Sequence, residues 1–315
     1  MKIRPIDPAQ ARTLKLATLS RLVRRADFAK PLKPGATMRQ FLDSLPDVLA
    51  ARELRELARR VARAHRAGRP VLLLMGAHPI KCGLGPIICD LLRDRILSAV
   101  AMNGAAIIHD FELAFAGRTS EDVGEGLADG TFGMAEETGA FLNRAAKIAA
   151  DENQGLGEVV GREILKSHLK FRASSVLATA FDVGAPATVH VAIGADMIHM
   201  HPSADGSAIG RATMADFHRL AAVVGKLSRG VAINLGSAVL MPEVFVKALN
   251  LARNLGRKVT GFTTADMDFT RHYRPRVNVI ERPTAGGGRG IALTGHHEIM
   301  FPLLAAAIRE EIARS

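Results

Sequence analysis

The chain has 315 residues, of which 48% are hydrophobic and 23% charged, so it is long enough for a large core and too apolar for a disordered protein. Its formal net charge is +11, but no aromatic residues are interleaved with the basic ones, as stacking on unpaired bases would require. Two cysteines, seven positions apart, are too few for a disulfide framework. No apolar run approaches a membrane span and the first residues lack the apolar core of a signal peptide. We therefore expect a cytoplasmic protein without membrane or nucleic-acid partners.

Residues 1–70 predict an N-terminal helical extension with a proline-marked break at 30–35. Between positions 52 and 69, arginines recur at helical spacing opposite Leu54, Leu57 and Val61. This pattern is typical of an amphipathic helix with a solvated basic face. Residues 71–315 are predicted to form a single globular unit.

Residues 71–94 predict a buried strand, a glycine-containing turn and a helix. The apolar run Val71–Met75 is followed by Gly76, Gly83 and Gly85, and then by an apolar-periodic segment. Glycines let a ligand approach the backbone, and a helix N-terminus favours phosphate, so this turn is a candidate nucleotide site. An ordinary strand–helix turn explains the same glycines equally well.

The same alternation recurs along the chain. Strands are predicted at 96–101, 187–193, 231–235, 259–264 and 291–294, and each ends in small or polar residues before a helix. We therefore expect a Rossmann-like, doubly wound α/β fold with a mainly parallel sheet, and a ligand beyond the carboxyl ends of its strands. Residues 118–139 are polar and glycine-rich, and predict a long loop with a short helix that serves as a lid or a subunit contact.

Five segments resemble the deoxyhypusine synthase family, in the same order and with similar spacing, over most of residues 70–310. They are LMGAHPIKCGLGPIICDLL (74–92), MNGAAIIHDFELA (102–114), GVAINLGSAVLMPEVFVKALNLAR (230–253), GFTTADMD (261–268) and GHHEIMFPLLAAAI (295–308).

The resemblance implies a Rossmann-like domain that binds NAD near the subunit interfaces of a homotetramer. Family members move the aminobutyl group of spermidine onto a lysine. The family's cofactor positions correspond here to Pro79, Asn103, Gly104, Ala105, His109, Asp196, Gly236, Ser237, Thr264, Ala265 and His296. At Pro79, His109 and His296 the family has serine, glutamate and aspartate.

The family's catalytic lysine has no counterpart in this chain. It lies in a tryptophan–glycine–lysine segment that corresponds to residues 279–283, where the nearest basic residue is Arg282. A guanidinium stays protonated and cannot form an imine. The family's active-site histidine falls at Pro242 and Glu243. We therefore expect an NAD-binding enzyme that acts on a small amine or amino-acid-like substrate and does not make deoxyhypusine.

Several residues are candidates for this chemistry. His109 and Asp110, at a predicted helix start, are candidates for proton transfer. Lys81, within the first glycine turn, could contact phosphate or form a Schiff base, although a solvated loop lysine is the simpler interpretation. Glu243 is a candidate contact for a substrate amine. Asp268, His272 and Arg282 are further candidates for substrate binding.

Two alternatives remain open. His199 and His201 flank Met200, so both could point to one side and form a divalent-metal site with His296 and His297. This set would suit a metal-dependent hydrolase or lyase. The second alternative is a non-catalytic oligomer that binds a ligand without turnover.

Overall fold

The computed structural model describes residues 3–314, and its centre is a six-stranded, entirely parallel sheet in the order β3-β2-β1-β4-β5-β6. The predicted Rossmann-like, doubly wound α/β fold is confirmed. The strands are β1 (Val71–Met75), β2 (Ala99–Asn103), β3 (Ala187–His190), β4 (Val231–Leu235), β5 (Thr263–Asp268) and β6 (Arg289–Thr294).

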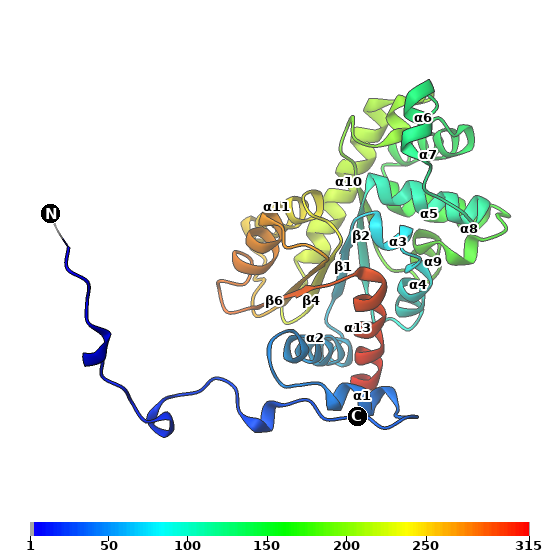
Figure 1. Cartoon of the computed structure of the whole chain (residues 1–315). Coiled ribbons are helices and arrows are strands. Elements are labelled where there is room, and N and C mark those ends of the chain that lie inside the picture. The colour runs from blue at the N-terminus through cyan, green and yellow to red at the C-terminus, as the bar shows by residue number, and fades with distance from the viewer. Residues whose placement is uncertain (1–2, 315) are drawn as a thin grey trace.

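Helices cover both faces of this sheet (Figure 1). The α-helices are α1 (Met38–Ser44), α2 (Leu49–Arg66), α3 (His78–Lys81), α4 (Gly85–Arg93), α5 (Gly104–Ala116), α6 (Val123–Asp129), α7 (Glu136–Asp151), α8 (Leu156–Lys166), α9 (Val176–Asp182), α10 (Gly206–Val224), α11 (Leu240–Asn254), α12 (Tyr273–Pro275) and α13 (His297–Ile312). A π-helix spans Arg276–Glu281, and short 3-10 helices span Pro8–Gln10, Leu16–Thr18, Arg25–Asp27, Arg172–Ser174 and Met197–Met200.

The central strand β1 shows why the sheet has two buried faces. Its five residues are all buried, and alternate side chains enter different cores because successive residues of a strand point to opposite faces. Val71, Leu73 and Met75 pack with α2, α4, α5 and α13. Leu72 and Leu74 pack with the second half of α10 and with α11. A strand buried on both sides has no polar position, which explains its continuous apolar run.

The two parts of the expected N-terminal extension differ in structure. The amphipathic pattern of residues 52–69 is seen in α2, whose apolar residues Leu54, Leu57 and Val61 are buried in the core. Residues 3–26 contain only short 3-10 turns and lead away from the body of the molecule (Figure 1). This segment, Ile3–Ala26, is called the arm below.

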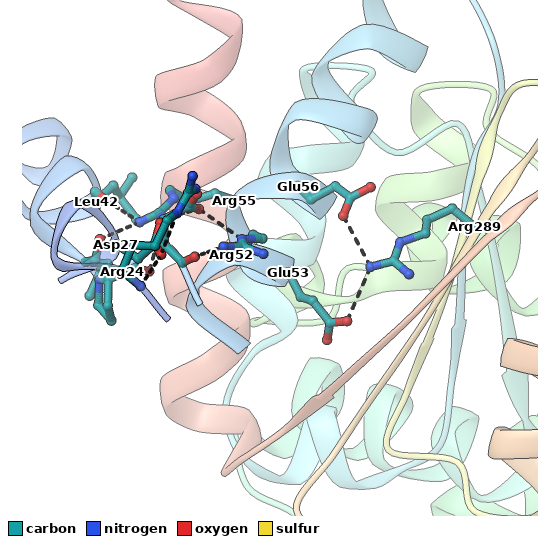
Figure 2. A network of polar contacts seen from close by, with 11 residues as sticks. Arg24, Asp27, Leu42, Arg52, Glu53, Arg55, Glu56 and Arg289 are labelled. Carbon is teal, nitrogen blue, oxygen red and sulfur yellow. Dashed lines mark hydrogen bonds and ion pairs between the residues drawn. The ribbon is translucent and has the colours of Figure 1, made fainter. Parts of the chain in front are cut away.

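Polar contacts fix the point where the arm meets the body (Figure 2). The buried Asp27 accepts a hydrogen bond from the backbone N–H of Arg24, and its own carbonyl accepts one from Asp47 N–H at 2.8 Å. Arg55 of α2 donates to the carbonyls of Leu42 and Leu45. On the same helix, Glu53 and Glu56 each lie 3.3 Å from Arg289 of β6.

Two strands lie later in the chain than predicted: β2, predicted over 96–101, spans Ala99–Asn103, and β5 shows the larger displacement. The sequence predicts a strand over 259–264, whereas β5 begins at Thr263 and ends at Asp268. The pairs Asn234↔Asp266 and Asp268↔Thr294 show that two acidic residues belong to the strand itself. Asp266 is tolerated there because the Asn234 amide of the neighbouring strand donates to its carboxylate at 2.7 Å.

Residues 118–139, predicted as a loop with a short helix, contain α6 and the first turn of α7. No helix among residues 3–314 is long and apolar enough to cross a membrane.

Candidate active site at the carboxyl edge of the sheet

The sheet reverses its winding between β1 and β4, and in such folds ligands bind beyond the carboxyl ends of the strands at this point. Gly76 follows β1 and lies directly on the backbone of Gly236, which follows β4. A Cβ on Gly76 would lie 2.3 Å from the Gly236 carbonyl oxygen. Gly236 has a φ of +62° and in turn faces Pro79 and the ring of His297. These close contacts hold the turns after β1 and β4 together. We call the paired glycines Gly76 and Gly236 the floor of the candidate site, because a ligand beyond the strand ends would contact their solvent side.

Three rings meet beside this floor. His297, at the start of α13, is 1% exposed, and its ring centroid lies 5.1 Å from that of His78 and 5.8 Å from that of Phe269. The Phe269 side chain is about half exposed. The cluster therefore offers an aromatic surface, open to solvent at Phe269, against which a planar ring could stack.

The hydrogen bonds of His297 determine which of its nitrogens is free. Its Nε2 lies 3.2 Å from the Met267 carbonyl, which can only accept, so Nε2 carries the proton. Burial lowers the pKa of His297, although Asp268 at 3.6 Å opposes this shift. The neutral ring therefore leaves Nδ1 as a bare acceptor, and this atom is buried without a partner.

A second buried group lies on the neighbouring strands. The Asn234 amide donates both to the Ser237 carbonyl and to Asp266, so its oxygen Oδ1 remains without a partner. Burial raises the pKa of Asp266 to about 6, and the charge of Asp268 adds to this shift. Asp268 itself is 5% exposed and lies 3.9 Å from Nε2 of His272. These two carboxylates give the edge a negative character.

A third buried acceptor lies where β2 joins α5. Asn103 caps α5 by accepting from Ala106 N–H at 3.0 Å. The first residue of the helix, Gly104, lies beneath the carboxylate of Asp196, because a Cβ on Gly104 would be 2.0 Å from Asp196 Oδ2. Asp196 is 7% exposed, its Oδ2 has no partner, and burial raises its pKa to about 6.

The two residues proposed for proton transfer have different surroundings. His109 Nδ1 lies 2.6 Å from the hydroxyl of Thr119, which donates to Glu112. Burial, assisted by the charge of Lys81, lowers the pKa of His109 to about 4, so its imidazole is neutral. Glu112 and Thr119 line a cavity of about 660 Å³ formed with residues 115–138.

Asp110 is held by structural contacts. Its carboxylate accepts from the Ser175 hydroxyl at 2.6 Å and from the backbone N–H groups of Val176 and Leu177 at the start of α9. It therefore caps a helix that begins 66 residues later in the chain. These bonds occupy the carboxylate, and we do not retain Asp110 as a proton-transfer group.

The other candidates for substrate contact lie outside the ring cluster. Glu243 forms ion pairs with Lys247 and Arg274, which lower its pKa, and it also accepts a hydrogen bond from Asn278. Arg282 is exposed and donates to Asn278 at 3.0 Å. Glu243 and Arg282 thus share Asn278 as a partner, beside α11 and the π-helix.

Some predicted cofactor positions point away from the edge. Thr264 and Ala265 are fully buried within β5, because the strand ends four residues later than expected. Gly85 begins α4 and faces the Ser174 carbonyl. Gly83, Lys81 and His296 are exposed, whereas Ala105 and Cys82 are half-buried.

The histidines of the proposed metal site are not brought together. His199 Nδ1 accepts from Gly194 N–H, His201 packs on Gly139 and contacts the Gly133 carbonyl, and His297 contacts Met267. Within residues 3–314, no three His, Cys, Asp or Glu side chains are placed to hold a metal ion. The metal alternative therefore has no support in the described part of the chain.

Phe269, Asn234 and Asp266 were not predicted from the sequence as site residues, and His78 was placed at the carboxyl edge of the sheet without a role. The sequence does contain a pattern that predicts a contact for His78, because residues four apart in a helix are neighbours and Cys82 lies four residues later. In the structure, His78 Nε2 lies 3.2 Å from the Cys82 thiol. Asn234 and Asp266 gave no such signal, because their contact depends on the pairing of β4 with β5.

No protein-family model matches the chain, and no curated protein matches it in sequence. Similar solved structures include ArgZ, a cyanobacterial arginine dihydrolase (TM-score 0.54, 13% identity, 85% of this chain and 33% of that one). They also include AgrE in a ternary complex with ornithine and NAD⁺ (TM-score 0.52, 13% identity, 85% and 35%). A protein named as a deoxyhypusine synthase from Entamoeba histolytica has a TM-score of 0.50 and 10% identity over 89% of this chain and 95% of its own. The chain spans about a third of ArgZ and AgrE, and the likeness to all three is one of fold.

Proposed function

We propose that the chain is an NAD-binding enzyme that acts on a small amine or amino-acid-like substrate at the carboxyl edge of the sheet. The observation that carries the proposal is that three buried atoms at this edge, Asp196 Oδ2, Asn234 Oδ1 and His297 Nδ1, are all acceptors without donors. Buried acceptors without partners cost free energy, which a ligand with hydroxyl, amide or ammonium donors would recover. NAD carries hydroxyl and amide donors on its riboses and carboxamide, and an amine substrate carries the ammonium.

The surroundings of these atoms suit the two ligands. The rings of His78, Phe269 and His297 offer a stacking surface for a planar heterocycle. Asp266 and Asp268 favour a cationic amine over an anion. When bound, NAD would supply a hydride acceptor. AgrE, crystallised with ornithine and NAD⁺, shares this fold and supports the pairing of these two ligand classes.

In this proposal the residues of the chain position the amine and move its proton. Asp268 holds the ammonium by charge, and neutral His297 accepts a proton at Nδ1 while Met267 O keeps Nε2–H in place. The Cys82–His78 pair lies next to this ring and limits its movement. With Arg282 in the region of the family's imine-forming lysine, we propose that deoxyhypusine is not the product.

Binding of NADH can be measured directly by its own fluorescence, because the chain has no tryptophan and one tyrosine and contributes little background. We expect saturable binding that weakens at least tenfold in Asp196→Ala, a loss of about 1.4 kcal/mol. The matched control is Asp122→Ala, since Asp122 caps α6 through two backbone N–H groups. No binding to the wild type, or equal binding by Asp196→Ala, would refute the cofactor assignment.

A separate experiment tests whether the chain acts on an amine substrate. Ornithine, lysine and short diamines are incubated with NAD⁺, and NADH is followed at 340 nm in the wild type and in His297→Phe, which keeps the ring packing but lacks Nδ1. We expect turnover with at least one amine, and a loss of 100-fold or more in the variant. Binding of both ligands without turnover would indicate the non-catalytic oligomer instead.

Lys81 offers a further check of the reaction type. It is exposed beside the ring cluster, in the one-turn helix that also carries His78. If it forms a Schiff base, borohydride added during the reaction should attach the substrate to this residue, and Lys81→Arg should prevent the attachment. The assembly expected from the resemblance, a cytoplasmic homotetramer, is also proposed, and its mass in solution can be measured by light scattering.

A further inference from the structure

The arm exposes an unusual amount of apolar surface. Every residue of Ile3–Ala26 is exposed. Large aliphatic side chains occur throughout it, and most are more than half exposed: Ile3, Ile6, Leu14, Leu16, Leu19, Leu22 and Val23. Repeated exposure of large aliphatic side chains along one segment is typical of a segment that binds another surface.

The apolar side chains of the arm do not pack into the core of their own chain. It is anchored at Asp27, and from there it extends away from the sheet and its helices (Figure 1). An extended segment of 24 residues reaches about 80 Å at most, which is enough to cross a second molecule. Ordering such a segment costs conformational entropy, which contacts with a partner would offset.

The charge of the arm identifies the kind of surface it fits. Residues 3–26 contain six basic residues, Arg4, Arg12, Lys15, Arg21, Arg24 and Arg25, and one acidic residue, Asp7. A matching surface would be acidic and would carry exposed apolar side chains of its own.

Residues 118–139 of the same chain provide this combination. They contain six acidic residues, Glu121, Asp122, Glu125, Asp129, Glu136 and Glu137, and one basic residue, Arg118. Exposed Val123, Leu127 and Met134 lie among them, at 49%, 69% and 41% exposure. The cavity of about 660 Å³ opens here, lined by Met134, Phe115 and two of these carboxylates, Glu121 and Glu137. We call residues 118–139 the acidic surface.

The arm and the acidic surface lie at opposite ends of the molecule, with α6 far from the point where the arm leaves the body (Figure 1). We propose that the arm of one copy of the chain binds the acidic surface of a second copy. Its aliphatic side chains cover Val123, Leu127 and Met134, and its basic residues pair with the carboxylates around the cavity. This contact is independent of NAD and of the reaction proposed above.

Cross-linking of the full-length chain tests the contact directly. Equal amounts of ¹⁴N- and ¹⁵N-labelled chain are mixed and treated with a carbodiimide, which joins lysine to carboxylate without a spacer. We expect peptides of mixed isotope composition that join Lys15 to the acidic surface. Cross-links of Lys15 only within one isotope, or only to other carboxylates, would overturn the proposal.

Charge reversal gives a second, thermodynamic test. One variant carries Arg12→Glu, Lys15→Glu and Arg21→Glu, another carries Glu125→Lys, Glu136→Lys and Glu137→Lys, and a third carries all six. Sedimentation should show association weakened about tenfold in each of the first two and restored in the third. The control, Lys226→Glu, Arg229→Glu and Arg257→Glu, changes net charge as much as the arm variant does but lies elsewhere, on the α10–α11 side.

The same variants separate other possible partners of a basic, apolar arm. Association unchanged in the first two variants overturns the proposal. The proposal is also overturned if charge reversal in the arm abolishes binding to RNA or to anionic vesicles while the association of the copies is unaffected. Restoration by the third variant is the outcome that only pairing between these two segments produces.

Discussion

The turns after β1 and β2 follow the same layout in the sequence but use their glycines differently in the structure. After β1, Gly76 packs on the Gly236 backbone and leaves no room for any side chain. After β2, Gly104 makes room for the buried carboxylate of Asp196, which has an oxygen without a partner. The first glycine holds two strands of the sheet together, whereas the second keeps a polar group in place at a helix start. Of the two, the β2 turn is therefore the better candidate for ligand contact.

The largest effect is expected from Gly76→Ala. The new Cβ would lie 2.3 Å from a backbone carbonyl that is fixed between β1 and β5, so relief requires the sheet to move. We expect a loss of about 3 kcal/mol or more in unfolding free energy, measured by urea denaturation. Gly83→Ala is the comparison: its φ is +75° but nothing lies nearby, so about 1 kcal/mol is expected. Equal losses would show that the Gly76 contact is not a tight one.

A smaller, pH-dependent effect is expected from Asp196→Asn in the absence of ligand. The folded pKa of Asp196 is about 6, above its ordinary 3.8, so the folded state binds more protons and the native protein loses stability as pH rises from about 4 to 6. The neutral amide removes this loss. We expect the variant to gain up to about 2 kcal/mol at pH 7.5 and little at pH 4, as measured by denaturation at both pH values. An equal gain in unfolding free energy at both pH values would contradict the raised pKa of Asp196.

Gly104→Ala should have a more moderate effect that depends on Asp196. Alanine favours the helix, but its Cβ would displace the carboxylate, so a net loss of about 1 kcal/mol is expected. In the double variant with Asp196→Ala this loss should disappear. Such a double-mutant cycle measures the contact directly. Additive losses in thermal unfolding would mean that the two residues do not touch.

The smallest effect is expected from Cys82→Ser at the β1 turn. The thiol is half-buried, burial raises its pKa, and its contact with His78 at 3.2 Å is a weak one. Serine preserves the shape, so stability should change by less than about 1 kcal/mol. If calorimetry showed a loss of 2 kcal/mol or more, the turn after β1 would depend on its polar contacts as well as on its glycines.

The sequence predicted the fold well because the buried strands carry a strong local signal. β1 and β4 were located to the residue, since a buried run that is wholly apolar in β1, and apolar except for Asn234 in β4, identifies a strand covered on both faces. β5 was displaced because it contains Asp266 and Asp268, which on local rules belong after a strand. Only the pairing with Asn234 makes an acidic residue acceptable there, and a contact between residues 32 positions apart is not visible in a local pattern.

Individual roles at the site were less predictable, for a related reason. Asp110 had the position and chemistry of a catalytic acid, but it is occupied by the start of α9, 66 residues away. Asp196 was predicted through the resemblance. Its distinguishing feature is that the buried oxygen Oδ2 has no hydrogen-bond donor, which can be seen only in the three-dimensional structure. Whether NAD binds there remains a prediction for the experiments above.

Both outer strands of the sheet are partly covered by contacts with helices. At one side, Asp216 and Thr213 of α10 accept from the N–H groups of Val189 and Val191, on the side of β3 that faces away from β2. At the other, Glu53 and Glu56 of α2 hold Arg289 of β6 (Figure 2). An uncovered outer strand invites a strand from another molecule, so these covers prevent two copies from merging their sheets into one. We therefore expect an assembly of this chain to use helix surfaces and the proposed arm contact, and to form and dissociate without opening the parallel sheet.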